Sequence, residues 1–125
     1  MDQAAAHAFV DQWVRDWNAL DIEGVLAHFA DDAVFTSPVA ARVQPETAGV
    51  VRGKEALRAY WSLALTLVPD LHFEIVGTYV GIDTLVIHYR NQRRALVCEV
   101  LTFDGGLVVE GHGTYLEPYP SPEVS

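Results

Sequence analysis

The sequence contains a single cysteine, few basic residues and no long apolar run. Cys98 has no second cysteine to pair with, so no disulfide can form within the chain. Eight Lys and Arg residues against seventeen Asp and Glu residues give a formal net charge of −9. Nucleic acids and anionic membranes require a basic surface, so we expect neither as a partner. No apolar run approaches the roughly 20 residues of a membrane-spanning helix, and the N-terminus lacks the pattern of a secretory signal. We therefore expect a cytoplasmic protein.

The composition is typical of one globular domain. Half of the 125 residues are hydrophobic and a fifth are charged, which is enough for one buried core. We assign residues 1–118 to this domain. The proline-containing segment 119–125 is expected to be a mobile tail.

A carboxylate stands in the middle of an apolar strand pattern. Residues 94–103 (RALVCEVLTF) are rich in β-branched and apolar side chains and contain no Gly or Pro, which predicts a long strand. Glu99 lies at the centre of this segment. A buried carboxylate requires a raised pKa or a charged or hydrogen-bonding partner, so Glu99 is the first candidate for chemistry.

Three segments have the apolar spacing of amphipathic helices. The first covers residues 3–20 and carries two tryptophans one turn apart. Asp21 is expected to cap a second, shorter helix, and Gly53 begins the third. The aromatic residues of the first and third helices fit either a packed core or the wall of an apolar pocket.

The remaining pattern is dominated by strands. Residues 33–37 predict a short strand that Pro38 ends, and residues 39–52 predict a loop with a brief strand at 49–52. Four longer strands, separated by turn residues, are expected at 72–80, 84–91, 94–103 and 107–116. Three helices followed by a four-stranded antiparallel meander indicate an α+β fold with helices covering one face of the sheet.

Two turns decide which side chains share a sheet face with Glu99. A two-residue turn at Asn91 and Gln92 places His88 on that face, diagonally offset on the neighbouring strand, and a three-residue turn reverses this. The turn length of the last hairpin is equally undecided from the sequence. A three-residue turn at 104–106 places Gly111 opposite Glu99, with Gly113 and Tyr115 on the same face, whereas a two-residue turn places His112 there.

Three segments together resemble a known family. They are AFVDQWVRDWNALDIEGVLAHFADDAVFTSP, VRGKEALRAYW and VCEVLTFDGGLVVEGHGTY, which begin at residues 8, 51 and 97. Their order and spacing resemble the SnoaL-like, ketosteroid-isomerase-like group of the nuclear transport factor two superfamily. The resemblance implies a cone-shaped, curved, mainly antiparallel sheet wrapped around three N-terminal helices, with an apolar pocket between them. It also implies a homodimer formed through the outer sheet face.

The resemblance carries over to the functional residues only in part. Ser37 stands where ketosteroid isomerase has its Asp base, and a neutral hydroxyl cannot take an α-proton unaided. Trp13 occupies the position of the Tyr that forms part of the oxyanion hole in ketosteroid isomerase. Glu99 occupies the position of the protonated Asp of that enzyme and keeps a carboxyl group. Gly113 matches the acidic residue that similar polyketide cyclases place on the last strand. The alignment favours Gly111 and Gly113 facing inward.

The candidate site combines an acid/base pair with an apolar pocket. Glu99 and His88 are the expected catalytic residues because both can titrate near neutral pH. A satisfied buried ion pair, or a carboxyl that only anchors a ligand, are the alternatives. No metal site or cofactor is expected, since the histidines lack metal-site spacing and no phosphate-binding glycine loop is present. The expected substrate-binding residues are Trp13, Trp17, Phe35, Ser37, Tyr60, Trp61, Leu65, Val97 and Tyr115.

These observations predict a small-molecule pocket protein. The first hypothesis is an isomerase, cyclase, dehydratase or hydrolase that acts by acid/base chemistry on a small apolar, carbonyl- or ring-bearing metabolite. The alternative is a homodimer that binds such a ligand without catalysis.

Overall fold

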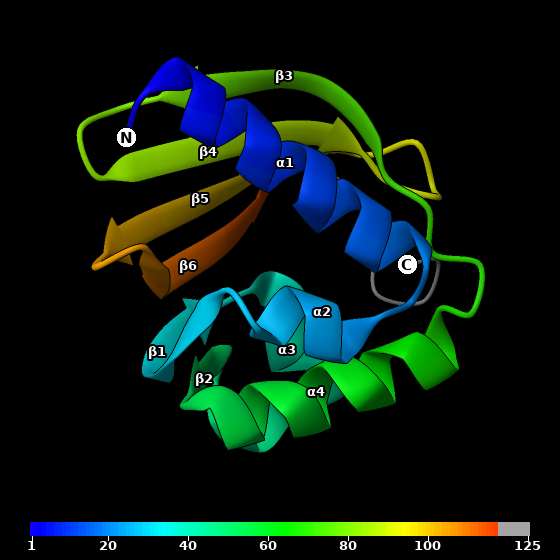
Figure 1. Cartoon of the computed structure of the whole chain (residues 1–125). Helices are drawn as coiled ribbons and strands as arrows, with labels where there is room; N and C mark the ends of the chain where they lie inside the picture. Colours follow the sequence, from blue (N-terminus) through cyan, green and yellow to red (C-terminus); the bar gives the residue numbers. More distant parts are fainter. Residues whose placement is uncertain (118–125) are drawn as a thin grey trace.

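The computed structural model describes residues 1–117 as helices packed against one sheet (Figure 1). The predicted tail at 119–125 lies outside these residues. The helical elements are α1 (Gln3–Asn18), α2 (Ile22–Leu26), α3 (Pro38–Val43), the 3-10 turn η1 (Pro45–Thr47) and α4 (Lys54–Leu67). The strands are β1 (Phe29–Thr36), β2 (Val50–Arg52), β3 (Glu74–Val80), β4 (Thr84–Arg90), β5 (Leu96–Asp104) and β6 (Leu107–Tyr115).

All of these strands belong to one curved sheet, in the order β2-β1-β6-β5-β4-β3. The predicted meander from β3 to β6 is confirmed, and the brief strand β2 pairs with β1. β1 runs parallel to β6, whereas every other neighbouring pair is antiparallel. The sheet is therefore mainly antiparallel, as predicted.

The helices fill the concave side of the sheet. In Figure 1, α1 crosses in front of the long strands, while α2, α3 and α4 lie together beside β1 and β2. Contacts of α1 with β3, of α4 with β1 and of α2 with α4 hold the two groups in place. The sheet wraps around the helices, which confirms the predicted α+β fold. Among residues 1–117, no helix is both long enough and apolar enough to cross a membrane.

The predicted loop at 39–52 is wrong in its first half, which forms the short helix α3. The Ser37 hydroxyl accepts a hydrogen bond from the Val39 amide at 3.1 Å, and Pro38 takes the first helical position. Ser followed by Pro is a helix-start signal because the hydroxyl satisfies a free amide and proline needs no amide partner there. The cap predicted at Asp21 is confirmed, since its carboxylate accepts from the Gly24 amide at 3.0 Å.

The register between β4 and β5 contradicts the predicted pairing of His88 with Glu99. Ile87 lies opposite Glu99, and His88 lies opposite Cys98 on the outer face. The connection spans the five residues 91–95 rather than a two-residue turn, because Asn91 organises it: its side-chain oxygen accepts from the amides of residues 93 and 95 at 2.9 and 3.0 Å. Compared with the predicted two-residue turn, a connection with an odd number of residues places each β4 side chain on the opposite face of the sheet relative to Glu99.

The register between β5 and β6 combines features of both predicted alternatives. Asp104 pairs with Leu107, so the turn has two residues, as in the alternative that would place His112 opposite Glu99. A bulge then shifts the register by one residue and places Gly113 opposite Glu99. Gly113 therefore faces inward as the family alignment favoured, although Gly111 is not the residue directly opposite Glu99.

Candidate functional site

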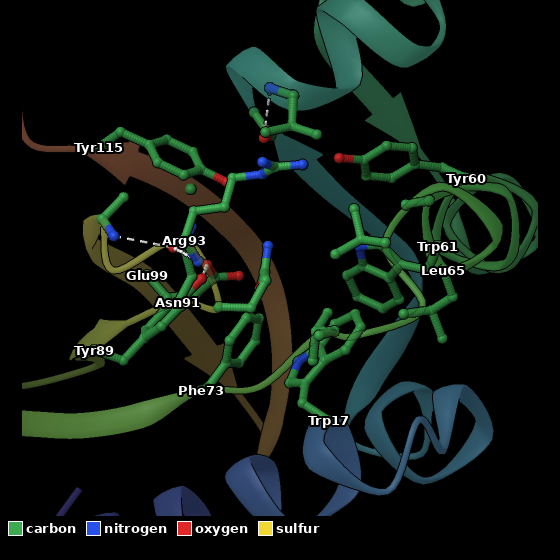
Figure 2. A pocket seen from close by; sticks show the side chains of 18 of the residues that line it. Trp17, Tyr60, Trp61, Leu65, Phe73, Tyr89, Asn91, Arg93, Glu99 and Tyr115 are labelled. Carbon is green, nitrogen blue, oxygen red and sulfur yellow. Dashed lines mark hydrogen bonds between the residues drawn. The ribbon is translucent and has the colours of Figure 1, made fainter. Parts of the chain in front are cut away.

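A cavity of about 140 Å³ opens between the inner face of the sheet and helix α4 (Figure 2). Cavities of about 150 Å³ in other proteins hold one benzene ring, so the space fits a ligand with a single small ring. Its lining residues come from α1, β1, α3, α4, the strands β4 to β6 and the loops beside them. The cavity has an apolar half and a polar half.

Glu99 lies in the wall of this cavity and is 7% exposed. Burial in the sheet raises the pKa of its carboxyl from 4.5 to about 7, because the charged form loses its hydration. The Tyr89 hydroxyl donates a hydrogen bond to the Glu99 Oε1 atom at 3.1 Å and acts in the opposite direction on this pKa. The carboxyl is therefore able to give up or accept a proton near neutral pH.

Gly113 leaves the space in front of Glu99 open. A Cβ atom at Gly113 would lie 3.5 Å from the Ser37 Oγ atom and 3.8 Å from the Glu99 Oε1 atom. Those distances are ordinary contacts, so a small side chain would fit here only by occupying the space next to the carboxyl. The glycine thus contributes to the cavity by its lack of a side chain.

Hydroxyl groups surround the polar half of the cavity. In Figure 2 the side chains of Tyr60 and Tyr115 reach into the same space from opposite sides. Burial raises the pKa of Tyr60 to about 12 and raises the pKa of Tyr115 as well, while Ser37 and Arg42 act to lower both. Both tyrosines remain protonated near neutral pH and can donate hydrogen bonds to a ligand.

Aromatic rings form most of the apolar half. Trp17 and Trp61 pack edge to face with ring centroids 5.2 Å apart, and Phe35 meets Trp61 at 5.6 Å. Phe73 lies against Tyr89 with centroids 4.3 Å apart. Such faces favour flat, apolar ligands through dispersion and ring-edge contacts.

A side-chain clamp fixes this wall and, through it, the carboxyl. The amide group of Asn18, at the end of α1, donates to the Phe73 carbonyl at 3.0 Å and accepts from the Phe73 amide at 2.8 Å. Phe73 in turn packs on Tyr89, which holds Glu99. The chain of contacts links α1 to the position of the carboxyl on β5.

The structure brings most of the predicted site residues together. The predicted residues that line the cavity are Trp17, Phe35, Ser37, Tyr60, Trp61, Leu65, Glu99 and Tyr115. Trp13 does not line it: this residue is 1% exposed and its ring stacks on Phe73, behind the wall. Val97 does not line it either, being 1% exposed and paired with Tyr115 in the sheet.

His88 lies on the outer face of the sheet, away from the cavity. Its Nδ1 atom is 3.4 Å from the Tyr79 hydroxyl, which lies on the same outer face. The predicted acid/base pair of Glu99 and His88 is therefore wrong. The partner that Glu99 does have, Tyr89, was missed because the turn at residues 91–95 determines the face and its length is not evident from the sequence.

Other lining residues were also missed. They are Val39, Arg42, Ala64, Val68, Leu71, Phe73, Asn91, Gln92, Arg93 and Ala95. Arg42 belongs to the unpredicted helix α3, and the Ser-Pro signal at its start could have revealed it. The group at 91–95 belongs to the β4–β5 connection, which closes over the polar half. Within residues 1–117, no three His, Cys, Asp or Glu side chains converge in a way that would hold a metal ion.

Comparison with known proteins identifies the family. A SnoaL-like protein of unknown function from Burkholderia thailandensis is 40% identical and superposes with a TM-score of 0.86, over 91% of this chain and 96% of that chain. An NTF-2-like protein of unknown function from Burkholderia xenovorans is 16% identical, with a TM-score of 0.70 over 96% of this chain and 89% of that chain. TerC, co-crystallised with polyporic acid, is 12% identical, with a TM-score of 0.74 over 89% of this chain and 91% of that chain. The last two show a shared fold.

No curated protein matches the chain. The SnoaL-like domain family matches it over residues 10–111, which is most of its length. The cavity, the curved sheet and this match lead to one conclusion: the chain belongs to the SnoaL-like domain family.

Proposed function

We propose that the protein is an acid/base enzyme acting on a small, ring- or carbonyl-bearing metabolite, with Glu99 as the proton carrier. The observation that carries the proposal is a buried carboxyl with a pKa of about 7 in the wall of a ring-sized cavity. This raised pKa makes both the acid and the base forms of Glu99 available near neutral pH.

The reaction that fits this arrangement is proton transfer next to a carbonyl group. Ionised Glu99 would remove a proton from the carbon beside the carbonyl, and the resulting enolate oxygen would accept hydrogen bonds from Tyr60 and Tyr115. Preorganised donors of this kind stabilise developing charge because they need no rearrangement during the reaction. Neutral Glu99 would then return the proton at another position.

The position of His88 narrows the reaction class. With His88 on the outer face, Glu99 is the one lining carboxyl or imidazole group among residues 1–117. Isomerisation or ring closure can use one group that takes and returns a proton, whereas dehydration and hydrolysis generally need a second group for the leaving group or the water. We therefore favour an isomerase or a cyclase over a dehydratase or a hydrolase.

The same observation supports a second candidate, a ligand-binding homodimer without catalysis. A lone buried carboxyl with a raised pKa can simply fix the polar end of a ligand. TerC was co-crystallised with an organic acid, which supports binding of small organic molecules by this fold. Catalysis and binding are distinguished by whether Glu99 moves protons.

Solvent exchange provides the test. Cyclopentanone and cyclohexanone would be incubated with the protein in D2O, and replacement of their α-hydrogens would be followed by proton NMR. The proposal predicts faster exchange with the protein, rising with pH as Glu99 ionises. Glu99→Gln should lose this exchange and still quench tryptophan fluorescence on binding, whereas the exposed control Glu46→Gln should behave as the wild type.

The outcome separates the two candidates. Equal exchange by the wild type and Glu99→Gln would refute a catalytic role for this residue. Ligand-dependent quenching without exchange in either protein would support the binding function instead.

We also propose that two copies associate through the outer face of the sheet. Tyr79, Val86 and Val100 lie side by side on this face, and Tyr79 is 56% exposed. A Tyr79→Arg substitution would place a charge among these apolar side chains and should convert a dimer into a monomer in analytical ultracentrifugation. A monomeric wild type would contradict the proposal.

A further inference from the structure

We propose that the ligand of this cavity is a ring-bearing carboxylic acid whose anionic group binds Arg42. The inference rests on the small-molecule function proposed above and names the chemical class of the ligand. Arg42 lies in the last turn of α3, and its side chain lines the polar half of the cavity.

Arg42 lacks a partner among the residues that the structure describes. The ion pairs within residues 1–117 involve other basic residues. The Arg42 guanidinium forms no hydrogen bond with any residue in this described part of the chain. Arg42 is half-buried, and a guanidinium that lines the polar half of a cavity without an ion-pair partner is stabilised when an anion binds beside it. Its planar group with several donors matches a carboxylate, which it can bind through two parallel hydrogen bonds.

The charge distribution of the chain favours an anionic ligand at this place. The whole sequence has seventeen acidic and eight basic residues, yet within residues 1–117 the cavity is lined by two arginines, Arg42 and Arg93, and one carboxyl, Glu99. Among the described residues, cationic side chains thus outnumber carboxyl groups in the cavity wall of an acidic protein. Such local concentration attracts anions and orients them as they enter.

Neutral donors and one unsatisfied acceptor complete the polar half. Tyr60 and Tyr115 are close enough to Arg42 for its charge to lower the pKa of both hydroxyls. The three side chains can therefore bind the same group of a ligand. The side-chain oxygen of Gln92 is buried and has no hydrogen-bond partner within the described part of the chain. An ionised carboxylate has no proton to donate to this oxygen, so a hydroxyl or N–H group elsewhere on the ligand would be needed to satisfy it.

The apolar half defines the rest of the ligand. Its aromatic walls and the volume of about 140 Å³ accommodate one small ring. The ring would lie against Trp17, Trp61 and Phe73 while the acid group reaches the arginine. The carbon skeleton between them would then pass in front of Glu99.

Benzoate and benzamide form a matched pair of probes for this arrangement, since they share size and shape and differ in charge. Binding would be followed by quenching of tryptophan fluorescence, because Trp17 and Trp61 line the cavity. The wild type should bind benzoate about tenfold or more tightly than benzamide, as expected for a charge-assisted contact. Arg42→Gln should remove this preference, so that benzoate and benzamide bind about equally.

Arg52→Gln is the matched control, because Arg52 is exposed on β2, outside the cavity, and its replacement changes the net charge equally. It should keep the preference for benzoate. Equal binding of the two probes by the wild type, absence of benzoate binding, or an unchanged preference in Arg42→Gln would overturn the inference. Ketone exchange that depends on Glu99 would stand in those cases, so failure of the ligand class and failure of the proposed chemistry are distinguishable.

Discussion

Replacing Glu99 by glutamine should stabilise the protein at alkaline pH, because the change removes a carboxylate that becomes charged inside the cavity wall. Glu99 is 7% exposed, and burial raises its pKa from 4.5 to about 7. Glutamine has nearly the same shape and keeps an oxygen that can accept the hydrogen bond from Tyr89. It never ionises, so the comparison isolates the effect of the charge.

The sign and the size of the effect follow from proton linkage. Between pH 4.5 and about 7, folded Glu99 holds a proton that the unfolded chain has already released. The stability that this raised pKa contributes is fully present below about pH 4.5 and is lost as the pH rises through about 7. The difference between the two pKa values corresponds to about 3 kcal/mol. For a chain of this length that is roughly 10 °C in Tm.

Urea unfolding of both proteins, followed by tryptophan fluorescence at pH values from about 4 to 9, measures this difference directly. The free energy of unfolding of Glu99→Gln relative to the wild type should increase by about 3 kcal/mol over this range, with most of the change between pH 5 and 7. Glu46→Gln, on an exposed residue, should show no such increase. Parallel pH profiles of the wild type and Glu99→Gln would show that folding does not raise the pKa of Glu99 and would contradict this prediction.

Four further substitutions test other parts of the site. Gly113→Ala should fold normally and weaken quenching by benzoate, because its methyl group would contact Ser37 and Glu99 at 3.5 Å or more and fill the space beside them. Gly111→Ala is its control: its methyl group would lie 2.9 Å from an aromatic carbon, so thermal melts should show a loss of about 1–3 kcal/mol. Tyr89→Phe removes a hydrogen bond that lowers the pKa of Glu99, so the pH midpoint of ketone exchange should move upward; an unchanged or lower midpoint would contradict this. Ser37→Ala removes the cap of α3 and should cost about 1 kcal/mol in urea unfolding, and an unchanged stability would show that the cap contributes nothing.

The elements of the fold could be predicted from the sequence because they depend on local patterns. Apolar spacing identified the long helices, and runs of β-branched residues between turn residues identified the four long strands. Glu99 stood out because a carboxylate interrupts such a run. The short helix α3 was missed although Ser37 and Pro38 carry its start signal, since six residues provide too little periodicity.

The neighbours of Glu99 were harder to predict because they depend on the parity of two connections. The side chain of Asn91 stabilises a five-residue connection, which moves Tyr89 to the inner face and His88 to the outer face. A bulge in β6 reverses the parity that its two-residue turn would impose, and brings Gly113 in front of the carboxyl. Each of these two features shifts the pairing of neighbouring strands by one residue. Local composition does not specify a shift of that size.

A carbon-13 NMR titration of the Glu99 side-chain carboxyl, with Glu99→Gln used to assign its signal, measures directly whether this group titrates near neutral pH. A midpoint of about 7 is expected, because the carboxyl is buried in the cavity wall beside Tyr89. A midpoint close to 4.5, the ordinary value for an exposed glutamate, would contradict this expectation.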